Sequence, residues 1–278
     1  LGNILDIKEI TKNIKLINPD TLVLVDGVAF FPHNLIDVHD LDVDFYLISF
    51  YKFCGLRISL LYSKENVYNK IKNQNHYFLE NNKDKKLLLG GINYECAISI
   101  IGIKRYFQQF YEFINNKKYE KFDRKLVEFV MNNINNYERQ LSKIFLDKLK
   151  NNKDISIIQD ENTEKIPLFS IDFKDYNNKN VNFFLNEIGL LSNSSTFYCN
   201  RLFSDNNLNI HEGLLRISLM HYNNISEVEK ICDYINLFQL KKLKFEFSKI
   251  NSNLIDDDLK KSFDNLPTDK YYINKRNR

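Results

Sequence analysis

The sequence is poor in the residues that mark turns and in those that build metal or disulfide frameworks. Its 278 residues include 8 glycines, 4 prolines and no tryptophan, so few turns can be located from glycine or proline. Its four cysteines lie far apart and form no Cys-x-x-Cys pair, which argues against a zinc site and a disulfide framework. No apolar run is long enough to span a bilayer, and the net charge of +3 is too small to indicate binding to nucleic acid or to a membrane surface.

The segment from Thr21 to Tyr62 is the most informative part of the chain. Two short apolar runs in it, LVLV and FYLIS, are rich in β-formers and predict buried strands. Asp26 follows the first run and Lys52 follows the second, where open α/β sheets collect their ligand sites. A lysine there can form a Schiff base with an aldehyde cofactor, and an aspartate can keep a pyridinium nitrogen protonated. These are the main protein contacts of pyridoxal phosphate (PLP).

Three blocks of sequence carry a family resemblance. They are VDGVAFFPHNLIDV with DVDFYLISFYK and ISLLY, then GGINYE at positions 90–95, then LLRISLMHYNNISEVEKI. With these blocks in this order, the chain resembles the class V aminotransferase family, which has the fold type I PLP architecture. Within that family it is most similar to the cysteine-desulfurase-like group. The likeness covers roughly residues 1 to 240.

The resemblance implies a role for each matched residue. Lys52 would form the Schiff base with the cofactor, and Asp26 would be the partner of the pyridine nitrogen. Ser49 would contact the cofactor phosphate, and Asn93 would donate or accept a hydrogen bond near the site. Arg216 would hold the carboxylate of an amino-acid substrate, because its planar guanidinium can bind a carboxylate through two hydrogen bonds.

Cys199, in the stretch STFYCNRLF, is the candidate nucleophile. A desulfurase needs a thiolate that takes sulfur from the substrate and holds it as a persulfide. Cys199 falls in the loop region where some relatives place that cysteine, although Tyr198 is the closer match in position. A free cysteine is otherwise a small core residue, so both interpretations stay open.

Several positions depart from the family pattern. Ala29 stands where the family usually has His or Gln, Tyr51 stands at a frequent His position, and Gly91 replaces a threonine that reaches a cofactor phosphate. The family also has a substantial region before the point where Leu1 opens, so we expect an N-terminally truncated, C-terminal part of such a protein. A non-catalytic fragment or degenerate paralogue, retaining the fold as a binding or assembly module, therefore remains the alternative.

We expect three regions along the chain. Residues 1–120 would be a partial PLP-binding large domain of the α/β class, with a mostly parallel sheet and helices. Residues 121–240 would be a smaller α+β domain that includes a bridging helix, and residues 241–278 a charged extension. Helical spacing predicts a buried helix in ECAISIIGIKRYFQQFYEFI and a long amphipathic helix in RKLVEFVMNNINNYERQLSKIFLDKLK. Ser226 and Glu229 have the spacing of a capping box for the last helix.

The function that the resemblance implies is PLP-dependent chemistry on a small amino acid through Lys52. Sulfur removal from cysteine, or a related transferase or lyase reaction of class V aminotransferases, would be the outcome. The family usually forms homodimers, and a desulfurase would pass sulfur to an acceptor protein. We expect no metal, nucleic-acid or membrane partner. We expect a cytoplasmic location, with an organellar targeting peptide left open because the N-terminal region is expected to be missing.

Overall fold

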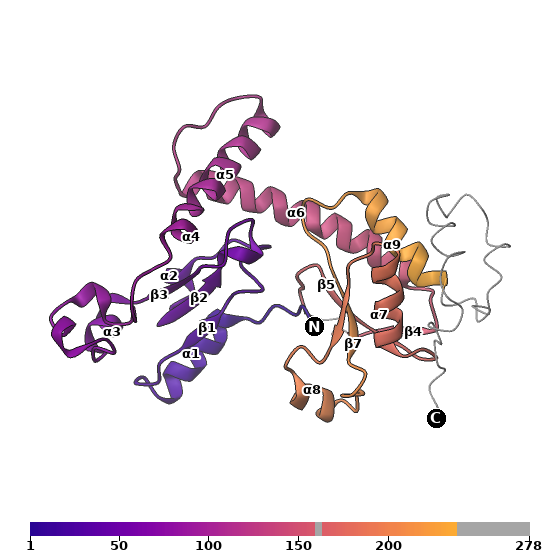
Figure 1. The fold of residues 1–278 in the computed structure, drawn as a ribbon, viewed down its shortest axis with the longest axis horizontal. Coiled ribbons are helices and arrows are strands. Elements are labelled where there is room, and N and C mark those ends of the chain that lie inside the picture. The colour runs from indigo at the N-terminus through magenta and orange to yellow at the C-terminus, as the bar shows by residue number, and fades with distance from the viewer. Residues whose placement is uncertain (159–162, 238–278) are drawn as a thin grey trace. The chain divides into compact units, whose positions relative to one another are not determined.

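The computed structural model describes residues 1–158 and 163–237. The chain divides into two units: the N-terminal unit, Leu5–Asn136, and the C-terminal unit, Leu1–Ile4 with the chain from Tyr137 onward (Figure 1). The charged extension predicted at 241–278 lies outside the described residues. No helix in the described part of the chain is long and apolar enough to cross a membrane.

The N-terminal unit is built around a three-stranded sheet in the order β1-β2-β3. Its helices and strands are α1 (Ile7–Ile17), β1 (Leu24–Asp26), α2 (Val38–Leu41), β2 (Phe45–Ser49), β3 (Ser59–Ser63), α3 (Glu65–Lys70), α4 (Tyr94–Ile98), α5 (Ile100–Asn115) and the first part of α6 (Arg124–Leu149). Three 3-10 turns, Phe50–Lys52, Tyr77–Leu79 and Lys83–Lys85, complete the unit.

The sheet of the N-terminal unit is mixed. β1 and β2 run parallel, whereas β2 and β3 run antiparallel. The chain between β1 and β2 includes α2 and is long enough for a parallel crossover, whereas the short connection from β2 to β3 suits antiparallel neighbours. The predicted α/β class is therefore confirmed, while the sheet is not mostly parallel over the described strands.

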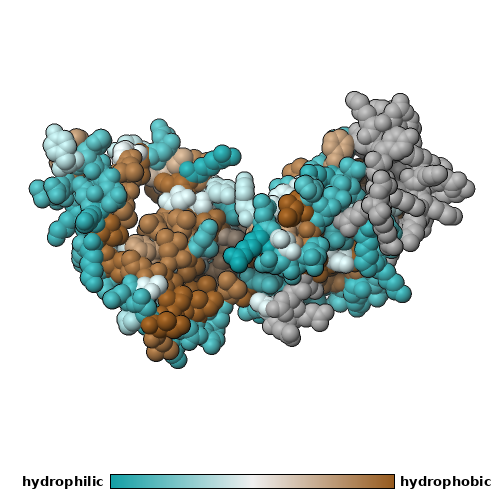
Figure 2. Space-filling model, turned by 90° about the horizontal axis from the view of Figure 1, so that it is seen from below, coloured by the Kyte–Doolittle hydropathy of each residue, from teal (hydrophilic) through white to brown (hydrophobic). Residues whose placement is uncertain are grey.

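The predicted buried helix after residue 94 is wrong in its burial. It forms as α4 and α5, but only Ile103 and Phe107 of α5 are buried, and Phe113 is 89% exposed. Other apolar residues of α5 pack against the same core while partly exposed, and Ile101, Phe113 and Ile114 face solvent. The brown surface over this unit in Figure 2 shows how much apolar surface the unit exposes.

The predicted long amphipathic helix is confirmed as α6, and the boundary between the two units along the chain falls within it. The Asp123 carboxylate caps its first turn by accepting the N–H of Leu126 at 3.1 Å. The first half buries Leu126, Val130 and Ile134 in the core of the N-terminal unit, and the second half buries Leu141, Phe145 and Leu149 in the core of the C-terminal unit. The expected boundary at residue 120 instead assigned the whole helix to the second domain. Because the apolar spacing continues through α6 without a break, the sequence did not mark the change of core.

The C-terminal unit holds a four-stranded antiparallel sheet in the order β4-β5-β7-β6. Besides the end of α6, its elements are β4 (Ile155–Ile157), β5 (Leu168–Phe173), α7 (Asn178–Glu187), β6 (Asn193–Ser195), α8 (Asn200–Asp205), β7 (Leu214–Ser218) and α9 (Ile225–Leu237). Phe169 and Ile171 of β5 oppose Ile217 and Leu215 of β7, and these side chains share one core with α6, α7 and α9. An antiparallel sheet with helices packed on one face is the expected α+β arrangement.

The capping box of α9 uses different residues from those predicted. The Glu227 N–H donates to Asn224 Oδ1 at 2.9 Å, and the Asn224 N–H donates to Glu227 Oε2 at 3.0 Å. The pair predicted at Ser226 and Glu229 lies two residues too late. Asparagine caps a helix as well as serine does, so the helix begins at the earlier signal.

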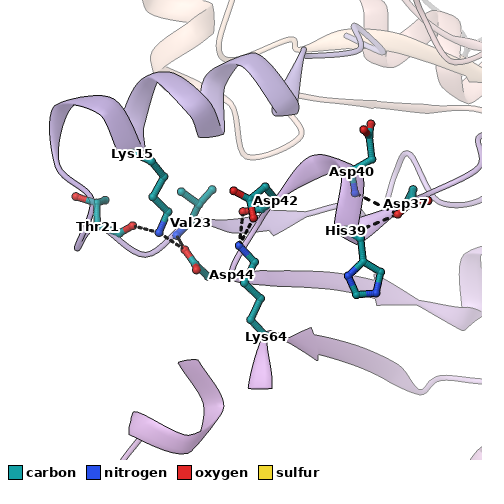
Figure 3. Close-up of polar contacts among 9 residues, drawn as sticks. All are labelled: Lys15, Thr21, Val23, Asp37, His39, Asp40, Asp42, Asp44 and Lys64. Carbon is teal, nitrogen blue, oxygen red and sulfur yellow. Dashed lines mark hydrogen bonds and ion pairs between the residues drawn. The ribbon is translucent and has the colours of Figure 1, made fainter. Parts of the chain in front are cut away.

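Asp44, the residue directly before β2, connects the segment before β1 to α1 through hydrogen bonds. Its side chain is 4% exposed and accepts hydrogen bonds from Lys15 Nζ at 2.7 Å and from the Val23 N–H at 2.8 Å (Figure 3). Burial by itself raises the pKa of Asp44, but these hydrogen bonds and the charges of Lys15 and Lys64 outweigh it, so its pKa lies below the ordinary value.

We expect Asp44→Ala to lower the free energy of unfolding by about 2 kcal/mol, because the variant leaves buried donors without an acceptor. Since the folded pKa of Asp44 is depressed, its contribution is present above the unfolded pKa of about 4 and is lost as the pH falls through the folded pKa. Urea unfolding at pH 7 and in steps below pH 4 measures both effects. Asp40→Ala, which breaks the exposed ion pair with Lys8, is the control and should change stability little. Equal effects of the two variants would contradict the prediction.

Candidate functional site

Asp26 and Lys52 lie at the same edge of the sheet in the N-terminal unit. Asp26 is the last residue of β1 and pairs with Leu47 of the parallel strand β2. Lys52 ends the 3-10 turn that follows β2 directly. Because parallel strands end at one edge of a sheet, the structure brings these two predicted residues to neighbouring strand ends.

A close contact between Gly27, the residue after Asp26, and Tyr46 of β2 fixes the backbone at this edge of the sheet. The Gly27 N–H donates to the Leu47 C=O at 2.9 Å, and a Cβ at position 27 would lie 2.1 Å from the Tyr46 ring, so only glycine fits. Burial above all, and next the Asp26 charge, raise the pKa of Tyr46 to about 12. Tyr46 is therefore a neutral phenol within the electrostatic reach of Asp26. Sequence reasoning missed it, although the Asp-Gly pair at a strand end was the available signal.

Asp26 also shapes its own turn. Its Oδ1 accepts the Val28 N–H at 3.1 Å, as Asp-Gly turns commonly do, while the side chain stays exposed. The local bond orients the carboxylate at the strand end. The turn role and the predicted cofactor role are therefore compatible.

Lys52 sits on a firmly anchored turn, but its side chain is exposed. Phe50 and Phe53 on either side of it are buried, and the Phe53 ring packs edge-on against Phe31 and Phe107 at 5.5 and 5.6 Å. The N–H groups of Phe53 and Gly55 both donate to the Phe50 C=O. The backbone that carries Lys52 is therefore held by the core.

Ser49 and Asn93 are placed less favourably for their predicted roles. Asp26 and Ser49 share a face of the sheet, because Asp26 pairs with Leu47 two residues before Ser49. Ser49 is only 5% exposed, and its Oγ accepts a hydrogen bond from Ser59 Oγ at 3.3 Å. Asn93 caps α4 by accepting the Cys96 N–H at 2.8 Å, which is a local structural role.

The C-terminal unit brings together the other two predicted residues. Arg216 lies on β7 opposite Ser170 and Asn193, so it faces away from the helices that cover Leu215 and Ile217. Its Cζ lies 4.2 Å from the centre of the Phe197 ring. The Cys199 thiol donates to the Phe197 C=O, with 3.4 Å between Sγ and O. Phe197, which sequence reasoning did not single out, thus contacts both.

The four cysteines are free, and they differ in environment. Cys199 is exposed, whereas Cys232 is fully buried and its pKa is raised to about 12, by burial in the first place. Cys232 is therefore a packing residue. In residues 1–158 and 163–237, no group of three or more His, Cys, Asp or Glu side chains could hold a metal ion.

The sequence model of the family "Aminotransferase class-V" matches residues 1–77 and 124–231. The chain belongs to the class V aminotransferase family. The match includes Asp26, Ser49, Lys52, Cys199 and Arg216 but not Asn93 or the GGINYE block around it. Members of this family use PLP, and the similar proteins and folds below support the cysteine-desulfurase-like group within it.

Curated relatives of this class V chain include an aminotransferase-like protein of Gibberella zeae, 29% identical over 242 residues, which are 83% of this chain and 54% of that protein. A probable cysteine desulfurase of Mycoplasma genitalium is 26% identical over 261 residues, 91% of this chain and 57% of the relative. The chain thus spans about half the length of these two relatives. Its fold is similar to the apo structure of a cysteine desulfurase from Thermococcus onnurineus, with a TM-score of 0.69, 18% identity and coverage of 87% of this chain and 58% of the other.

We expect Gly27→Ala to lower the free energy of unfolding by about 2–3 kcal/mol, because the added methyl group would overlap the buried Tyr46 ring. Gly102→Ala is the matched control, since nothing lies within 4 Å of a Cβ built at this helical position. That variant should gain about 0.5–1 kcal/mol from helix propensity. Denaturant unfolding of both variants measures the difference, and a Gly27→Ala variant as stable as the parent would disprove the close contact.

Proposed function

We propose that the chain forms part of a PLP-dependent enzyme that acts on a small amino acid, with chemistry like that of cysteine desulfurases. The observation that carries this proposal is the placement of Asp26 and Lys52 at the ends of adjacent parallel strands. An amine and a carboxylate at one sheet edge match the two groups by which proteins bind PLP, a lysine that forms a Schiff base and a carboxylate at the pyridine nitrogen. Membership of the class V aminotransferase family supports the same reading.

Lys52, Asp26 and Arg216 would each have a separate role in the proposed reaction. Lys52 would hold the cofactor through Nζ and would move the proton at the substrate α-carbon. Asp26 would keep the proton on the pyridine nitrogen, and the neutral Tyr46 phenol behind it adds no competing charge. When bound, PLP supplies an electron sink for the negative charge that develops at the α-carbon. Arg216 would orient the substrate by binding its carboxylate.

Cys199 would supply the step that makes the reaction a desulfuration. Its thiolate would attack the sulfur of a cysteine substrate, so that an S–S bond forms as the C–S bond breaks. The electron pair of the C–S bond would stay with the substrate carbon, which takes up a proton, and the outer sulfur of the resulting persulfide would pass to an acceptor protein. Its exposure and its contact with Phe197, which stacks on Arg216, support this role. A homodimer, as is usual in the family, is part of the proposal, and a cytoplasmic location stays a prediction.

A second candidate is a non-catalytic module that keeps the fold. The exposure of the Lys52 side chain and the hydrogen bond between the Ser49 and Ser59 hydroxyls favour it, because the lysine is open to solvent and the serine already has a partner within the sheet. Ala29 and Tyr51, both exposed, also lack the polar contacts usual in the family. The next experiment separates this candidate from the enzyme.

Borohydride treatment of the full-length protein with PLP is expected to add the mass of the reduced cofactor to the peptide that contains Lys52. Lys52→Ala should abolish the adduct, because it removes the amine at that strand end, whereas Lys70→Ala on the exposed end of α3 should retain it. Peptide mapping by mass spectrometry identifies the site. An unmodified Lys52 peptide in the parent protein would support the non-catalytic module instead.

We expect Cys199→Ala to lower sulfide release from cysteine by at least about a hundredfold, because the variant lacks the group that takes the sulfur. The Lys52 adduct should persist in this variant. Cys54→Ala is the control, since Cys54 is also exposed and free but lies in the other unit. Undiminished turnover in Cys199→Ala would assign the protein to class V chemistry other than desulfuration.

A further inference from the structure

The guanidinium of Arg216 lies over the Phe197 ring. The 4.2 Å between Cζ and the ring centre is a close cation–π distance, and Arg216 is only partly exposed on β7. A guanidinium stacks through its face and donates hydrogen bonds in its plane. The ring can therefore orient Arg216 without occupying the edge that would bind a carboxylate.

The backbone that presents the ring is strained. Phe197 and the next residue, Tyr198, have φ values of 50° and 63°, in the left-handed region that bulky side chains rarely adopt. The Phe197 N–H donates to Ser195 Oγ at 2.7 Å, and the Cys199 N–H donates to the Thr196 C=O at 2.9 Å. These bonds fold residues 195–199 into a tight turn that ends at the thiol.

The turn is anchored on the strand that carries Arg216. Ser195 pairs with Leu214 of β7, and a Cβ at Gly213 would lie 2.5 Å from the Ser195 backbone, so the two segments are in close contact. Phe197 then contacts Arg216 through its ring and the Cys199 thiol through its carbonyl oxygen. One residue therefore connects the proposed carboxylate-binding group with the proposed nucleophile.

We propose that Phe197 is a positioning residue, whose stack on Arg216 holds the guanidinium for the substrate carboxylate and holds the turn that presents Cys199. The proposal rests on the proposed function for the roles of Arg216 and Cys199. A change at Phe197 thus disturbs both substrate affinity and the reactivity of the thiol. The neighbouring Tyr198 has the same backbone conformation but a fully exposed ring, so it serves as a matched control.

The test compares Phe197→Leu, Phe197→Tyr and Tyr198→Leu in the full-length protein with PLP. We expect Phe197→Leu to raise KM for cysteine about tenfold, in line with loss of a partly desolvated cation–π contact. It should also change the rate at which iodoacetamide alkylates Cys199, followed by peptide mass spectrometry. Phe197→Tyr keeps the aromatic ring, so its KM for cysteine and its Cys199 alkylation rate should stay near those of the parent. Tyr198→Leu should also leave both quantities near those of the parent.

A double variant distinguishes loss of the contact between Phe197 and Arg216 from a general loosening of the fold. If the stack carries the effect, adding Arg216→Lys to Phe197→Leu should change the alkylation rate no further than either single change. Unchanged alkylation in Phe197→Leu, or an equal change in Tyr198→Leu, would overturn the proposal. Alkylation needs no turnover, so a parent protein that does not desulfurate cysteine would reject the proposed function while the positioning effect is still measured.

Discussion

The parallel pairing of β1 with β2 is the constraint on which the candidate cofactor site depends. It is fixed at both ends: the Asp44 carboxylate holds the Val23 N–H before β1 begins, and the Gly27 N–H reaches the Leu47 C=O after β1 ends. Between them the buried Tyr46 ring fills the space that a side chain at position 27 would need. A shift of one residue would turn Asp26 to the other face and place a Cβ against that ring.

The aromatic core completes what the strand pairing begins. The turn after β2 carries Lys52 away from the sheet. Its backbone is held in place because Phe50 and Phe53, on either side of the exposed lysine, are buried. The chain has 22 phenylalanines and no tryptophan, and edge-on pairs of Phe53 with Phe31 and Phe107 contribute to this anchoring. The exposed Lys52 is thereby carried by a turn whose flanking phenylalanines are buried.

How much the sequence could predict depended on the length of each signal. The runs LVLV and FYLIS, and the long spacing of α6, were sufficient to place β1, β2 and α6 and to bring Asp26 and Lys52 together. β6 and α8 were missed because they are only three and six residues long, without a periodic apolar pattern. The stack of Phe197 on Arg216 joins residues nineteen positions apart through a left-handed turn, and no sequence pattern encodes such a contact.

The phenylalanine at position 197 indicates that its aromatic ring is needed, and not only the left-handed backbone conformation. Asparagine adopts left-handed φ values at much lower cost than phenylalanine, and this chain uses it so at Asn116 and Asn207, with φ values of 51° and 54°. A turn that needed only this backbone shape could be built in the same way. Phenylalanine at position 197 adds steric strain that the backbone shape does not require, and its ring centre lies 4.2 Å from Cζ of the Arg216 guanidinium. We therefore infer that the backbone strain at Phe197 is retained because its ring positions the Arg216 guanidinium. Strained backbone is often found at functional sites for this kind of reason.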